Sequence, residues 1–155
     1  MSQPNLPPRP CLVETTQTPT LDHARAVLAA QPFSLLLGTH LTSFGADGAV
    51  LELDVREHLT QQHGFVHGGV VSYLIDNAIT FAAGVALGAD LVTAGFTVDY
   101  VRPARGVRLA AHATVIKAGA ALAVLRCDVH AVDDEGQAEL CAVGQGRVAR
   151  RPARG

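Results

Sequence analysis

The hydrophobic and polar positions change their pattern twice along the chain. From Gly69 to Leu87 apolar residues fall on nearly every side of a helix, which predicts one long helix that must be buried. Alternating or continuous apolar stretches before and after it predict strands at 39–44, 49–55, 91–102, 107–117, 122–132 and 138–149. Strands joined by tight turns pair antiparallel. The expected fold class is therefore α+β, an antiparallel β-sheet wrapped around one long central helix.

Local signals mark the ends of several elements. Thr20 is placed to cap a short helix from Leu21 to about Gln31, and Pro32 is expected to end it. Gly45-Ala46-Asp47-Gly48 predicts the turn of a hairpin between the first two strands. A loop is expected from Arg56 to His67.

The domain organisation follows from length and composition. The 155 residues suit one domain of ordinary size. We expect a flexible leader at 1–19, because four prolines fall in its first ten positions, one domain at 20–150 and a tail at 151–155. Charged residues make up only 17% of the chain, against roughly 25% on average, which favours a surface partly covered by another subunit.

Charge and cysteine content argue against several classes of protein. The net charge of −2 and the 5% of aromatic residues are not typical of a nucleic-acid-binding protein. Cys11, Cys127 and Cys141 have no CxxC spacing, which indicates reduced thiols and a cytoplasmic location. Asp76 and Asp90 interrupt the longest apolar stretch, and the N-terminus has no signal-like apolar region. We therefore expect no membrane span and no secretory signal.

Asp76 is the candidate for chemistry in the central helix. It follows Leu74-Ile75, and no Lys or Arg occurs between Glu57 and Val101. A carboxylate is expensive to bury in such surroundings without a partner. Two interpretations remain open, a functional acid or a structural one that caps another segment or pairs with an arginine such as Arg102.

The helix begins at His67-Gly68-Gly69, which leaves backbone N–H groups unshielded by side chains. These groups and the helix dipole suit a developing oxyanion, although an isolated glycine pair is also typical of a tight turn. Gly68 and Asp76 are about 12 Å apart along a helix axis. If they act on one substrate, a two-fold homodimer must place Asp76 of one chain opposite Gly68 of its partner.

Two motifs resemble those of the hotdog-fold thioesterases. The first is Gln61-Gln62-His63-Gly64-Phe65-Val66-His67-Gly68-Gly69 followed by Leu74-Ile75-Asp76-Asn77, and the second is Tyr100-Val101-Arg102-Pro103-Ala104. The resemblance covers about 35–150 and is greatest to the phenylacetate-degradation (PaaI-like) branch. Gln61 and Thr80 are similar instead to the hydroxybenzoyl-CoA thioesterases. The resemblance implies hydrolysis of aryl- or fatty acyl-coenzyme A thioesters without a cofactor, in a homodimer that pairs into a tetramer.

The resemblance also implies roles for single residues. Asp76 matches the nucleophile or general base, and Gly68 matches the residue whose N–H polarises the thioester oxygen. His67 matches a residue that positions the thiolate side or shapes the loop. Gln61 and Thr80 are candidates for hydrogen bonds to water or to the carbonyl. Further candidates for contacts with the substrate are Gly69, Phe65, Tyr73 and Thr93. For Phe65 and Tyr73 a purely structural place in the core remains the alternative.

Other motifs fail on their context, and two other functions remain open. His63 and His67 have the i, i+4 spacing of metal ligands but lie in a loop, so no metal is expected. Gly144-Gln145-Gly146 is similar to part of a dinucleotide fingerprint but has no helix after it. One alternative is an acyl-thioester hydratase or dehydratase, whose relatives usually need a His paired with an acid on the central helix. The other is a non-catalytic module that binds CoA esters or another apolar ligand, with Asp76 structural.

Overall fold

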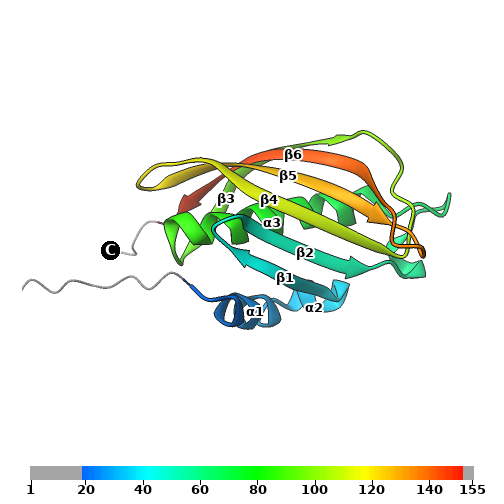
Figure 1. The fold of residues 1–155 in the computed structure, drawn as a ribbon, viewed down its shortest axis with the longest axis horizontal. Coiled ribbons are helices and arrows are strands. Elements are labelled where there is room, and N and C mark those ends of the chain that lie inside the picture. The colour runs from blue at the N-terminus through cyan, green and yellow to red at the C-terminus, as the bar shows by residue number, and fades with distance from the viewer. Residues whose placement is uncertain (1–18, 152–155) are drawn as a thin grey trace, which may run out of the picture.

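The computed structural model describes residues 19–151 and contains one sheet wrapped around one long helix. The helices are α1 (Leu21–Ala29), α2 (Pro32–Leu37) and α3 (Gly68–Leu87), with a 3-10 turn at Glu57–Leu59. The strands are β1 (Thr39–Gly45), β2 (Gly48–Asp54), β3 (Leu91–Tyr100), β4 (Arg108–Ala118), β5 (Leu122–Val132) and β6 (Ala138–Arg150). All neighbouring strands are antiparallel, in the order β1-β2-β4-β5-β6-β3, and α3 crosses the sheet while α1 and α2 lie beside β1 (Figure 1). The predicted α+β fold is confirmed.

The helix α3 packs against the sheet through the apolar residues that predicted it. Ile75 and Ile79 are fully buried, and β6 presents glycines to them. A Cβ atom at Gly144 would lie 2.5 Å from Ile75 Cγ2, and one at Gly146 would lie 2.5 Å from Ile79 Cδ1. The two glycines of the supposed dinucleotide motif therefore allow helix and sheet to approach closely.

One prediction about α3 is wrong in part, because the helix is not buried on every side. Ten of its 20 residues are buried, but Ser72, Asp76, Thr80 and Gly84 are all partly exposed. Their spacing of four residues places them on one face of the helix. The edge strand β3 contacts this face through Thr93 and Tyr100 but leaves all four residues partly exposed, and we call it the uncovered face. The helix is long and apolar enough by composition to cross a membrane, but 56% of its most apolar window is buried in the fold, as expected of a core helix.

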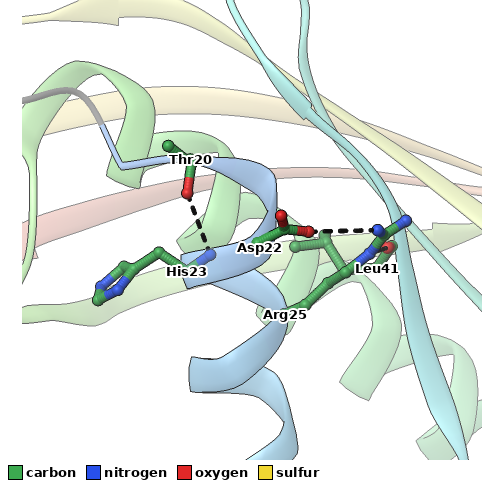
Figure 2. Close-up of polar contacts among 5 residues, drawn as sticks. All are labelled: Thr20, Asp22, His23, Arg25 and Leu41. Atoms are coloured by element: carbon green, nitrogen blue, oxygen red, sulfur yellow. Dashed lines mark hydrogen bonds and ion pairs between the residues drawn. The ribbon is translucent and has the colours of Figure 1, made fainter.

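The two N-terminal helices differ from the prediction at Pro32. The Thr20 side chain caps α1 as expected by accepting a hydrogen bond from the His23 amide at 3.2 Å (Figure 2). Pro32, however, occupies the first turn of a second helix, where its missing N–H costs nothing. The Arg25 Nε atom donates to the Leu41 carbonyl oxygen at 3.0 Å and so attaches α1 to β1 (Figure 2).

The strand β3 lies at an edge of the sheet and does not pair with β4, the next strand in the chain. Residues 101–107 are a crossing segment rather than a tight turn, and the Val66 amide donates to the Ala104 carbonyl oxygen of this segment at 3.0 Å. β3 therefore pairs with β6 alone, and Val92, Phe96 and Tyr100 are exposed on it. The prediction that tight turns join all of the last four strands is wrong at this point.

Candidate active site

The Asp76 carboxylate faces β3 and accepts a hydrogen bond from it. Thr93 Oγ1 donates to Asp76 Oδ1 at 2.5 Å, and Thr80 Oγ1 lies 3.0 Å from Thr93 Oγ1. Thr80 also donates to the Asp76 carbonyl oxygen at 2.9 Å, one helical turn away. All three side chains are only partly buried. The structure therefore brings together three of the predicted site residues in a cluster with an acid at its centre.

The structural interpretation of Asp76 as a partner of Arg102 is wrong. Arg102 Nη1 instead lies 2.9 Å from Glu139 Oε1, on the surface. No lysine, arginine or histidine among residues 19–151 forms an ion pair with Asp76. The carboxylate is therefore held by the Thr93 hydroxyl, and it keeps access to solvent.

The start of α3 is held by its own capping residue and by β3. His67 Nδ1 accepts a hydrogen bond from the Gly69 amide at 2.9 Å, whereas the Gly68 amide has no acceptor in the described part of the chain. The Tyr100 hydroxyl lies 2.9 Å from the Gly68 carbonyl oxygen and 2.8 Å from Ser72 Oγ. Because the Gly68 amide lies at the positive end of the helix dipole, it is available to an oxyanion.

A first cavity lies beside this helix start, with a volume of about 430 Å³. Two predicted residues line it together with Gly68. Gln61 Oε1 accepts from the His63 amide at 2.8 Å, and Phe65 packs under Arg105, whose Cζ atom lies 4.2 Å from the ring centroid. The remaining lining residues are Val66, Val71, Tyr100, Val101, Arg102, Pro103, Ala104 and Cys141. The cavity has an apolar floor and one cationic side.

A second cavity of about 370 Å³ lies at the opposite end of α3. Thr80, Phe81 and Gly84 of α3 form one side of it, α1 forms another, and the start of β3 closes it. The remaining lining residues are Pro19, His23, Ala24, Val27, Gln31, Phe44, Gly88, Ala89, Asp90 and Leu91. Because Thr80 contacts Thr93, this cavity begins next to the Asp76 cluster.

Tyr73 lines neither of these two cavities. Its hydroxyl lies 2.7 Å from Ser34 Oγ and 3.0 Å from Thr39 Oγ1, and Asn77 Nδ2 donates to it at 3.0 Å. The ring of Phe33 meets the ring of Tyr73 edge to face. Tyr73 therefore attaches α2 to α3, and its predicted contact with substrate has no support from its position.

Sequence reasoning missed two parts of the site. The role of the Tyr100 hydroxyl at the helix start was not foreseen, although Tyr100 belongs to the second motif. The contribution of α1 to the second cavity was also missed, because the resemblance began only at about residue 35. The predicted strand at 91–102 already placed Thr93 and Tyr100 on one strand, but its pattern of apolar residues carries no signal that this strand lies against α3.

The described cysteines do not offer a nucleophile. Burial, with a smaller contribution from Asp128, raises the pKa of the Cys127 thiol to about 12. Burial also raises the pKa of Cys141, which lines the first cavity. Both thiols therefore stay protonated near neutral pH, and a thiolate mechanism has no support. Within residues 19–151, no group of three metal-ligating side chains converges.

Comparison with known proteins decides the family. The model of the thioesterase superfamily matches residues 63–138, from the loop before α3 into the start of β6. Human acyl-coenzyme A thioesterase 13 is 32% identical over 108 residues, which are 68% of this chain and 77% of that protein. The chain belongs to the thioesterase superfamily. A Mycobacterium tuberculosis protein named as an esterase is 36% identical over 89 residues, and the match spans 54% of this chain and only 64% of that relative's length.

Solved structures of this superfamily have the same hotdog architecture. A thioesterase family protein from Silicibacter pomeroyi superposes with a TM-score of 0.76 at 31% identity, over 81% of this chain and 93% of that one. The Escherichia coli PaaI protein from the phenylacetic acid degradation operon superposes with a TM-score of 0.74 at 24% identity, over 84% of this chain and 92% of that one. The likeness to PaaI concerns the fold.

Proposed function

We propose that this thioesterase-superfamily protein hydrolyses acyl-coenzyme A thioesters to free acid and coenzyme A. The observation that carries the proposal is the partly exposed Asp76 carboxylate on α3, hydrogen-bonded by Thr93. Asp76 itself lines neither cavity, but its neighbour Thr80 lines the second and Gly68 of the same helix lines the first. The name of the human relative supports coenzyme A as the thiol part of the substrate. The hydratase alternative is disfavoured because α3 carries no histidine after its capping residue.

The chemistry requires an acid or base, an oxyanion site and a way to orient water. In this proposal Asp76 either takes a proton from the water that attacks the thioester carbon, or attacks that carbon itself to form an anhydride that water then hydrolyses to the free acid. Thr93 fixes one carboxylate oxygen by its hydrogen bond. Thr80 donates to the Asp76 carbonyl oxygen and lies beside Thr93. The Gly68 amide stabilises the oxyanion, and the thiolate of coenzyme A leaves. The residues supply every group that this reaction needs, so we expect no cofactor. From the cysteine pattern we also expect a cytoplasmic enzyme.

A homodimer would supply both halves of one site. Gly68 and Asp76 of one chain are eight residues apart on α3, about 12 Å along its axis. Both are linked to β3, since Tyr100 contacts Gly68 and Thr93 contacts Asp76. We propose that two β3 edges pair antiparallel about an axis between Phe96 and Thr97, which would place Thr93 opposite Tyr100 of the partner. Asp76 of one chain would then face Gly68 of the other, and pairing of such dimers would give a tetramer.

The first test replaces the acid without changing its shape. We expect Asp76→Asn to lower kcat/KM for thiol release from acetyl-, octanoyl- and benzoyl-coenzyme A by about 10²- to 10⁴-fold, the usual contribution of a general base. Asp47→Asn, in the exposed β1–β2 turn, is the matched control and should keep full activity. Equal activity of Asp76→Asn and the wild type would refute the mechanism. Absence of thiol release from all esters by the wild type would favour the binding module.

The second test asks whether each site is shared between subunits. Asp76→Asn and Gly68→Val are prepared separately and as co-expressed, mixed dimers. A Cβ atom at Gly68 would lie 3.3 Å from the Tyr100 hydroxyl and ring, so valine should displace the helix start. If sites are shared, random mixing should restore about a quarter of wild-type activity, because half of the dimers contain one intact site. No recovery, or sedimentation of the wild type as a monomer, would contradict the shared site.

A further inference from the structure

The cavity at the C-terminal end of α3 lies next to the proposed reaction centre. Thr80 lines this cavity, and only Thr93 separates the Thr80 hydroxyl from the Asp76 carboxylate. A thioester carbon held at Asp76 would therefore have its acyl group within reach of the cavity. The first cavity, beside the Gly68 amide and Arg102, lies toward the other end of the same helix.

The walls of the second cavity suit an apolar group. Its inner surface is formed by Ala24 and Val27 of α1, Phe44 of β1, Phe81 of α3 and Leu91 of β3. Four polar residues also line it, namely His23, Gln31, Thr80 and Asp90. His23 and Asp90 are exposed, and Asp90 lies 3.3 Å from Arg151, so these two belong to the rim. Burial of an alkyl chain against these side chains is favourable by the area removed from water.

The length of the cavity sets the size of the group. Its wall on the α3 side runs from Thr80 to Gly88, about 12 Å along a helix axis. An extended polypeptide advances 3.3–3.6 Å per residue, which is about 1.2 Å for each of its three backbone bonds, and we take the same advance per bond for an extended alkyl chain. The wall therefore matches an alkyl chain of about ten carbons. The volume of about 370 Å³ is near the lower limit for small-ligand pockets. The cavity has no room for the coenzyme A part of the substrate in addition to such a chain.

Gly84 lies halfway along this wall and keeps it open. A glycine inside a helix costs about 0.5–1 kcal/mol relative to alanine. The backbone at Gly84 does not require glycine, because its φ is not positive, and a Cβ atom there would meet nothing closer than Phe44 at 3.8 Å. Neither turn geometry nor close packing therefore explains the glycine. A side chain larger than that of alanine at this position would project into the space of the cavity.

We propose that this cavity binds the apolar acyl chain of the substrate, and that Gly84 and the helix α1 limit its length to about ten carbons. The inference rests on the proposed function for the position of the thioester. α1 is a fixed wall, because Thr20 caps it and Arg25 attaches it to β1. Medium-chain acyl-coenzyme A esters are then the preferred substrates.

The test fills the cavity halfway along its length. Gly84→Leu should lower kcat/KM for octanoyl-coenzyme A by about tenfold or more and leave butyryl-coenzyme A within about twofold, because only the longer chain passes position 84. Ala86→Leu, exposed on the same helix and outside the cavity lining, is the matched control and should change neither. Equal losses for both esters, or no loss for octanoyl-coenzyme A, would overturn the proposal.

A binding measurement separates this proposal from the proposed function. The dissociation constants of S-octyl- and S-butyl-coenzyme A, thioethers that cannot be hydrolysed, are measured by calorimetry for the same variants. Gly84→Leu should weaken the octyl compound alone, by about tenfold. If the wild type releases no thiol but the octyl compound shows this selective loss, the proposed function fails and the acyl cavity stands. If thiol is released but both thioethers bind the variant equally well, the acyl cavity fails.

Discussion

The two faces of α3 differ although their residues alternate along the chain. Ile75 and Ile79 are fully buried against the sheet, whereas their neighbours Asp76 and Thr80 are partly exposed on the other side. On the sheet side β6 carries glycines because there is no room for a Cβ atom. On the uncovered side Gly84 faces open space. One face of the helix therefore maintains the fold, and the other provides the site.

This difference shows how a helix that is apolar almost all round can carry a reactive acid. The sheet buries enough of α3 to hold it rigidly, so the remaining face can expose Asp76 without loss of the fold. A rigid element holds a catalytic group more precisely than a loop does. Changes where β6 packs on α3 should therefore cost the most stability, and changes around the Asp76 carboxylate should alter activity.

The largest effect is expected on the sheet face, at Gly146. A Cβ atom there would lie 2.5 Å from Ile79 Cδ1 and 2.8 Å from Phe96 Cβ, so Gly146→Val should lower the free energy of unfolding by about 3 kcal/mol. Urea unfolding followed by circular dichroism measures this change. Gln145→Val, one residue away on the exposed side of β6, should change stability by less than about 0.5 kcal/mol. Equal effects of both changes would show that the helix face is not tightly packed.

An intermediate effect is expected at Thr93, on activity alone. Thr93→Val keeps the shape of the side chain but removes the hydroxyl that donates to Asp76 Oδ1. Since hydrogen bonds to charged groups contribute about 1.5–3 kcal/mol, kcat/KM should fall by about tenfold or more. Thr97→Val on the same strand is the control, because the Thr97 hydroxyl lies 3.5 Å from a backbone carbonyl oxygen and does not contact Asp76. A similar loss of kcat/KM in both variants would mean that any change in β3 lowers activity, and that the Thr93 hydrogen bond to Asp76 is not its specific cause.

The sequence allowed the fold to be predicted because each element carries its own local signal. The long apolar run of α3, the cap at Thr20 and the glycine-rich turn before β2 depend on residues close in the chain. The pairing of β3 with β6 depends instead on a crossing segment and on contacts across more than 40 residues. No local signal reports which strands become neighbours. The second helix was missed because Pro32 both ends one helix and begins the next.

The candidate site could be predicted only as far as its motifs reach. Asp76, Thr80 and Thr93 were named from the sequence, and the structure brings them together. The predicted contact of Tyr73 with substrate came from its place on the helix, which does not distinguish the side facing α2 from the open side. The second cavity could not be foreseen, because α1 reaches it from outside the motif region. Its volume depends on how far apart α1, β1, α3 and β3 pack, and no single segment of the sequence determines that distance.

The smallest effect is expected where the uncovered face has its glycine. Gly84→Ala should raise the free energy of unfolding by about 0.5–1 kcal/mol, because alanine favours the helix and its methyl group enters open space. Gly88→Ala is the control in the same unfolding measurement and should do the opposite, since Gly88 ends the helix with a φ of 83° that alanine adopts only under strain. A loss of stability at both positions would mean that Gly84 serves packing, as Gly146 does on the sheet side. A gain at Gly84 alone would mean that the chain gives up helix stability there to keep the cavity open.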